Sequence, residues 1–117
     1  MPPPKTPPGA TAAEFAENRF GGPTQFLETI VTVGVALVRL VPPNPRRVAW
    51  LAQNRGLTNV GFGFNREVAA ATGFLLGAEG GVATANVETD GEGVTWEVFA
   101  ISTVAGQSVR VLETIRV

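Results

Sequence analysis

The chain has 117 residues, of which 44% are hydrophobic and 16% charged, and its formal net charge is −1. This length suits a single domain, and the charge balance argues against an overall basic nucleic-acid binder. The sequence contains no cysteine and no histidine, which excludes disulfide bonds, Cys/His zinc sites, cysteine nucleophiles and imidazole acid–base catalysis. Its 14 glycines and 9 prolines disfavour a helical bundle and suit many short strands.

The first 24 residues differ from the rest of the chain. They hold six of the nine prolines, and Pro-rich polar sequence favours extended polyproline II over a packed core. Thr11 and Glu14 match a capping box, which predicts a short helix after Thr11. Phe15 and Phe20 are too few to give that helix its own core. We therefore predict an extended arm over residues 1–24 that docks on a neighbour, with Phe15 and Phe20 as interface residues; disorder in the isolated chain is the alternative.

From Gln25 onward the sequence predicts strands. The apolar stretch 27–40 contains residues that alternate with a period of two, and Gly34 within it indicates a bulge or a break. The prolines of segment 42–45 end this stretch. Further strands are expected at 48–53, 59–64, 74–76, 82–87, 94–101 and 108–115.

Turn signals separate these later strands. Segment 65–73 is expected to be a loop, and Asp90-Gly91 is typical of a hairpin turn joining the strands on either side. Seven or eight strands about ten residues apart, with almost no helix, predict an all-β fold. We expect an antiparallel β-sandwich or jelly-roll-like small barrel over residues 25–117, with the Pro-rich arm extending from it.

Charged residues are unevenly distributed along this domain. Residues 39–66 contain five arginines and no acid, and residues 67–97 contain six acids and no base. The two blocks either neutralise each other within one fold or meet across a subunit boundary. Arg46 and Arg47 form the only adjacent basic pair, and we predict that they protect a strand edge or contact another subunit rather than bind phosphate.

No catalytic constellation emerges from the remaining motifs. Gly61 and Gly63 form an incomplete dinucleotide loop and fit a glycine-kinked strand better. The acidic segment 88–92 departs from the spacing of a calcium loop and fits a solvated turn. Trp50 and Trp96 have apolar neighbours on the same strand face, so we predict that both anchor the core. The sequence therefore predicts a structural or binding module rather than an enzyme, without a cofactor or metal.

No membrane or targeting segment is expected. The N-terminus lacks the apolar centre of a signal peptide, and the longest apolar stretch, 30–41, is far shorter than the roughly 20 residues that cross a bilayer. The lack of cysteine fits assembly in a reducing cytoplasm.

Six pieces of sequence occur in a familiar order. They are VPPNPRR (41–47), WLAQN (50–54), NVGFGF (59–64), GFLL (73–76), EVFAIS (97–102) and VRVLE (109–113). This order resembles a group of small β-rich proteins encoded among the virion genes of tailed bacteriophages. The resemblance covers residues 41–117 and contains no catalytic signature.

The resemblance implies a structural virion protein, first of all a capsid decoration (cement) protein that stabilises the outer shell through arm and β-domain contacts. The implied partner is the major capsid protein or another virion protein, with neither nucleic acid nor membrane, and the implied location is the virion after assembly in the host cytoplasm. A homo-oligomer, with a trimer favoured, would suit three-fold points of a shell.

Two alternatives stay open. A tail, baseplate or fibre component with a host- or glycan-binding role predicts exposed aromatic side chains near Phe62, Phe64 or Trp96. A small hydrolase predicts a pocket with convergent acids.

Overall fold

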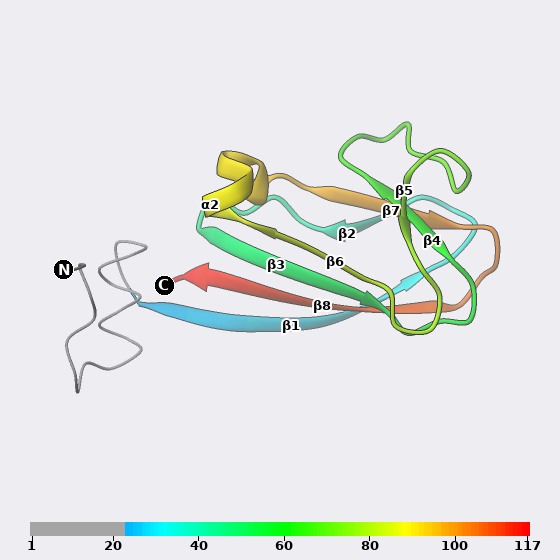
Figure 1. Ribbon diagram of the computed structural model, residues 1–117, viewed down its shortest axis with the longest axis horizontal. Helices are drawn as coiled ribbons and strands as arrows, with labels where there is room; N and C mark the ends of the chain where they lie inside the picture. Colours follow the sequence, from blue (N-terminus) through cyan, green and yellow to red (C-terminus); the bar gives the residue numbers. More distant parts are fainter. Residues whose placement is uncertain (1–22) are drawn as a thin grey trace.

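The computed structural model describes residues 23–117, whose strands form two antiparallel four-stranded sheets (Figure 1). One sheet consists, in spatial order, of β1 (Thr24–Val33), β8 (Gln107–Arg116), β3 (Arg47–Asn54) and β6 (Val82–Asn86). The other consists of β2 (Val38–Val41), β7 (Val98–Ser102), β4 (Val60–Gly63) and β5 (Phe74–Leu76). The predicted antiparallel β-sandwich is confirmed. The predicted arm helix, Phe15 and Phe20 lie outside the described residues.

The strand order is that of a jelly roll. Among strands that follow one another in the chain, only β4 and β5 are neighbours within one sheet, and each other connection in the described part of the chain crosses between sheets. Eight strands arranged in this way make the double-sheet jelly roll. The break expected at Gly34 is also confirmed, since β1 ends at Val33 and β2 begins in the second sheet at Val38.

The core lies between the two sheets. Strand β8 shows the underlying pattern, because Val109, Val111 and Ile115 are buried while Arg110 and Arg116 are exposed, the period of two of a strand with one covered face. Buried apolar side chains come from both sheets and from the segment before β7: Val33, Leu40, Val41, Trp50, Ala52, Val60, Phe62, Leu76, Val94, Val98, Ala100, Val109 and Val111.

The hairpin predicted at Asp90-Gly91 is wrong. The chain forms a helical turn, α2 (Val87–Asp90), followed by a 3₁₀ turn, η1 (Gly91–Thr95), and β6 and β7 belong to different sheets. The physical reason is a cap. The side-chain oxygen of Asn86 accepts hydrogen bonds from the N–H groups of Glu88 (3.0 Å) and Thr89 (3.1 Å), which satisfies donors that the first turn of a helix leaves unpaired. Within residues 23–117, no helix has the length and apolar character needed to cross a membrane.

Candidate functional site

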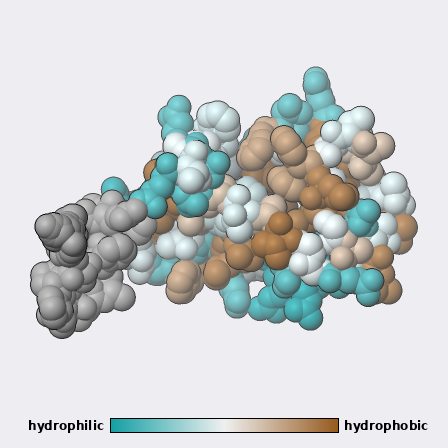
Figure 2. Space-filling model, in the orientation of Figure 1, coloured by the Kyte–Doolittle hydropathy of each residue, from teal (hydrophilic) through white to brown (hydrophobic). Residues whose placement is uncertain are grey.

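An aromatic groove is lined by residues of β3 and β6 in the first sheet and of β4 and β5 in the second. It has a volume of about 350 Å³, and Figure 2 shows apolar side chains gathered over this side of the molecule. The rings of Trp50 and Phe62 form its buried floor, and Trp96, Phe64 and Phe74 are exposed around it by 53%, 44% and 62%. We call these five side chains and the hollow between them the aromatic groove.

The rings of the groove contact one another in sequence. Trp50 meets Phe62 edge to face with centroids 6.4 Å apart, Phe62 lies 5.6 Å from Phe74, and Phe74 lies 6.3 Å from Phe64. Such pairs add to the stability that area burial alone supplies. The indole N–H of Trp50 is buried beside the groove and has no hydrogen-bond partner in the described part of the chain, an unusual state for a buried donor.

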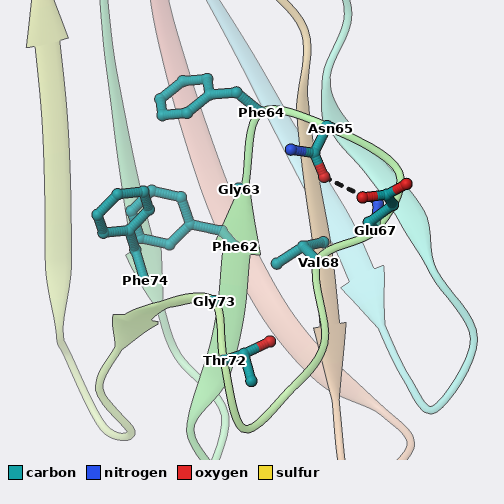
Figure 3. Close-up of a pocket in the computed structure, with 9 residues that line it drawn as sticks. All are labelled: Phe62, Gly63, Phe64, Asn65, Glu67, Val68, Thr72, Gly73 and Phe74. Carbon is teal, nitrogen blue, oxygen red and sulfur yellow. Dashed lines mark hydrogen bonds between the residues drawn. The ribbon is translucent and has the colours of Figure 1, made fainter.

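The Gly-Phe alternation of β4 explains why the rings gather on one side. In Figure 3 the rings of Phe62, Phe64 and Phe74 lie on the same side of β4, away from Val68. On the other side, the loop after β4 packs so closely that a Cβ on Gly61 would lie 3.1 Å from the Ala69 carbonyl oxygen. Glycine lets a second backbone approach a strand in this way. The Gly-Phe alternation of β4 therefore leaves its glycine face open to the loop and places the aromatic rings on the opposite face.

A buried arginine holds the backbone that carries Trp96. Arg47 is 1% exposed, and its guanidinium group donates to Glu113 Oε1 at 2.6 Å and to the Trp96 carbonyl oxygen at 2.8 Å. It also donates to the carbonyl oxygens of Pro42 (2.7 Å) and Val94 (2.8 Å). One side chain therefore joins β3, β8, the proline loop and the segment before β7. A buried charge is stable only when its hydrogen-bonding groups have partners. The hydrogen bond from Arg47 therefore holds the backbone of Trp96 in place.

A second exposed surface lies on β1, at the edge of the first sheet. Strand β1 pairs with β8 over ten positions, from Thr24↔Arg116 to Val33↔Gln107, and has no strand on its other side among the described residues. Residues 25–30 are all exposed, which includes side chains of both faces. Three of them are large and apolar: Phe26 is exposed by 73%, Leu27 by 47% and Ile30 by 60%.

The structure separates the two arginines predicted as interface residues. Arg46 is exposed, and an interface role for it stays a prediction. The Arg47 side chain is buried within the chain and paired with Glu113, so the edge-protection or subunit-contact role predicted for it does not match its position in the core. Phe15 and Phe20 fall outside residues 23–117, and the expectation for them also stays a prediction.

The prediction that both tryptophans anchor the core is half right. Trp50 is 4% exposed and buried, whereas Trp96 is 53% exposed. Trp96 follows η1 and precedes β7, which begins at Val98. The strand pattern of alternately buried and exposed side chains, which predicted its burial, therefore does not apply at its position. Sequence reasoning also missed Phe26 and Phe74 as exposed aromatic residues. Both lie on strands with a neighbour on one side only, a position that the sequence alone does not reveal.

The charge blocks contact each other at one described ion pair. Arg39 Nε lies 3.1 Å from Glu97 Oε2, which joins the basic block to the acidic block within the chain. Arg66 instead lies 4.9 Å from the centre of the Phe99 ring, a cation–π geometry. Intramolecular neutralisation therefore accounts for part of the opposed charge.

Carboxylates do not converge in the hollows described around the groove. Glu67 is the single carboxylate beside the loop in Figure 3, and Asp90 is the single carboxylate of the aromatic groove. The Asp90 carboxylate accepts hydrogen bonds from the Asn86 N–H at 2.9 Å and the Thr89 hydroxyl at 3.1 Å. Within the part of the chain that the structure describes, acidic side chains form no group suited to holding a metal ion.

Comparison with known proteins bears on the fold. No family model matches the sequence, and no curated protein matches it. The structure is similar to a chain from Bacillus endospore appendages, which are described as a novel family of disulfide-linked pili. The TM-score is 0.51 with 13% sequence identity, over 80% of this chain and 84% of that one. The chain therefore shares a small β-rich fold with a protein of these appendages.

Proposed function

We propose that this chain is a structural subunit that joins other protein subunits through strand β1. One observation carries the proposal. Residues 25–30 of β1 are exposed on both faces of the strand, and this segment includes Phe26, Leu27 and Ile30. Soluble proteins normally shorten, charge or cover the outer strands of their sheets, because an open apolar edge pairs with other chains. In β1 a single acid, Glu28, is the only charged residue.

A neighbouring subunit would bind this strand edge in two ways. A strand added beside β1 would take up the main-chain groups that do not face β8, which is the usual route of β-augmentation. Side chains of the same neighbour would cover Phe26 and Ile30, which β8 leaves exposed. A long strand is suited to this role, because each added residue contributes further backbone hydrogen bonds to the contact.

The fold likeness supports a role in an assembly. The similar Bacillus chain belongs to appendages described as disulfide-linked pili. The present chain has no cysteine, so it cannot form disulfide links of that kind, and the proposed junctions depend on buried area, hydrogen bonds and repeated attachment. Many weak contacts acting together give firm binding to a surface.

The more specific proposal is a capsid decoration protein of a tailed bacteriophage. It is supported by the order of sequence pieces over residues 41–117, and by a rigid jelly roll that exposes one long edge. On this proposal the partner is the major capsid protein or another virion protein, the oligomer is a trimer, and the chain carries out no catalysis. Arg46 and the N-terminal arm would add contacts to neighbouring subunits.

The proposal is tested by charging β1 without disturbing the core. Phe26→Lys combined with Ile30→Lys places two charges on the exposed edge, and Leu57→Lys is the matched control, since Leu57 is 81% exposed outside the strands. We expect self-association and binding to empty capsid shells from the same source to weaken at least about tenfold, which corresponds to about 1.4 kcal/mol. The control should bind as the original chain does. Equal binding by all three chains would contradict a role for β1.

A tail, baseplate or fibre component with a glycan-binding role is the second candidate function. The observation that favours it is the exposure of Phe64 and Trp96, because aromatic faces commonly stack on sugar rings. Screening the full chain and its Trp96→Ala variant against a glycan array tests this candidate. Binding that disappears with Trp96 would support it, and the absence of glycan binding would remove it.

A further inference from the structure

The aromatic groove has the chemistry of a proline-binding surface. Grooves lined by aromatic side chains recognise polyproline II segments, whose preformed conformation loses little entropy on binding. Here the exposed rings of Trp96, Phe64 and Phe74 surround a buried floor of Trp50 and Phe62. Apolar planes of this kind accept proline rings, which carry no N–H that would need a partner.

The same chain contains a matching segment. Pro4-Lys5-Thr6-Pro7 has the spacing P-x-x-P and lies among further prolines at 2, 3 and 8. Polyproline II has three residues per turn and rises about 3.1 Å per residue. Pro4 and Pro7 would therefore project from the same side, about 9 Å apart, and Lys5 would project away from both.

Charge supports the pairing of segment and groove. Lys5 is the only charged residue among the first 13 residues. Asp90 lines the groove and Glu67 lines a hollow beside it, and neither of these two sites contains a basic residue. Glu97 borders a third hollow but is already paired with Arg39. A segment with one positive charge therefore meets a groove bordered by acids, which favours association and sets its direction.

We propose that the Pro-rich segment 2–8 of one copy binds in the aromatic groove of a second copy. The inference rests on the proposed role as an assembly subunit and identifies a second junction for it. Strand β1 begins beside the end of β8, at the edge of the first sheet opposite β6. The described chain therefore begins at the opposite edge of this sheet from β6, which lines the groove. Docking on a neighbour instead of in its own groove is part of the proposal, and it would link copies head to tail, into a ring or a row.

A complementation experiment tests this junction in the full-length chain. All chains carry Phe26→Lys and Ile30→Lys, so that association through β1 is suppressed. One variant adds Pro4→Ala and Pro7→Ala, which damages the segment and leaves the groove; the other adds Trp96→Ala, which damages the groove and leaves the segment. Pro23→Ala and Val104→Ala are the matched controls, because they change an exposed proline outside segment 2–8 and an exposed residue outside the groove.

Sedimentation velocity gives the outcome. We expect each damaged variant alone to associate at least about tenfold more weakly than the controls, and an equimolar mixture of the two to form a dimer, since one intact segment can enter one intact groove. A mixture that stays monomeric would overturn the proposal. The role of β1 is judged separately, from the charged-edge variant in the otherwise original chain, so failure of one junction is not failure of the other.

Cross-linking provides a second measurement that leaves β1 unchanged. The chain has no native cysteine, so a Thr6→Cys chain and an Ala85→Cys chain carry one cysteine each. A disulfide that joins the two different variants therefore links position 6 to position 85. Ala85 lines the groove, and Val104→Cys is the control outside it. We expect oxidation to link Thr6→Cys with Ala85→Cys at least about tenfold faster than with Val104→Cys.

Three results would overturn the proposal. Equal rates for the two cysteine positions would show that the segment has no preference for the groove. Rapid closure of a chain carrying both Thr6→Cys and Ala85→Cys into a cross-linked monomer would show that the segment binds its own groove. Glycan binding that depends on Trp96, with association unaffected by Trp96→Ala, would assign the groove to a sugar instead.

Discussion

Strands β1 and β8 have the same length and pair at ten positions, yet their surroundings differ. In β8 the side chains alternate between buried and exposed, with Val109 and Val111 in the core. In β1 six consecutive residues, 25–30, are exposed, and burial is complete only at Val33. Identical backbone pairing has therefore produced one core strand and one surface strand.

The cause is the position of each strand in its sheet. Strand β8 lies between β1 and β3, whereas β1 has a neighbour on one side only. Hydrogen bonding to β8 fixes the backbone of β1, but burial of a side chain also requires another element above it. Phe26 and Ile30 therefore contribute little to the stability of a single chain, since both stay largely exposed after folding.

We expect the largest loss of stability when Arg47, which binds the Glu113 carboxylate of β8, is replaced. Arg47→Met leaves Glu113 buried without its partner and the carbonyl oxygen of Trp96 without a donor. We expect the free energy of unfolding to fall by about 3–5 kcal/mol, as measured by urea denaturation. Arg46→Met is the matched control, because Arg46 is adjacent and exposed, and its effect should stay within about 0.5 kcal/mol. Similar losses for both variants would contradict the assigned role of Arg47.

A smaller effect separates two valines that face each other across β1 and β8. Val109 of β8 is fully buried, and its partner Val31 of β1 is partly buried. We expect Val109→Ala to cost about 2 kcal/mol through lost transfer energy and a cavity, and Val31→Ala to cost less than half as much. Thermal and chemical denaturation of the two variants should agree on this order. A larger loss at Val31 would show that β1 is a core strand in solution.

We expect the smallest contribution to stability from the ion pair between β1 and β8. Arg110 Nη2 lies 3.2 Å from Glu28 Oε2, and the two side chains are 45% and 62% exposed. Solvent and salt screen such a pair, so a double-mutant cycle with Glu28→Gln and Arg110→Gln should give a coupling at the low end of the usual range of about 0.2–1 kcal/mol. A coupling well above 1 kcal/mol would mean that this part of β1 is less open to solvent than the structure indicates.

Local features made most of the fold predictable. The period of two located the strands, Gly34 marked the break between β1 and β2, and the prolines of segment 42–45 separated β2 from β3. The misplaced hairpin shows the limit of this reasoning. Asp90-Gly91 is a common turn pair, but the Asn86 side chain caps a helical turn before it, and capping oxygens compete with turn formation without a distinctive pattern.

The candidate site was less predictable because its parts are distant in sequence. Arg47 and Glu113 are 66 residues apart, and no spacing rule connects them, so the burial of that arginine required the fold. The Gly-Phe alternation of β4 indicated an unusual strand, but the sequence does not show that a loop covers the glycines and leaves Phe64 and Phe74 beside Trp96. The exposure of β1 likewise depends on its place at the sheet edge, which follows from the topology.

Amide hydrogen exchange along β1 tests the central claim most directly. In a monomer, alternate amides of β1 bond to β8 and the others face solvent, so every second residue of segment 25–32 should exchange rapidly. In the assembled form we predict slow exchange at all of these positions, because a neighbouring subunit covers the free edge of the strand. Alternate rapid exchange that persists unchanged in the assembly would contradict the claim that β1 joins the subunits.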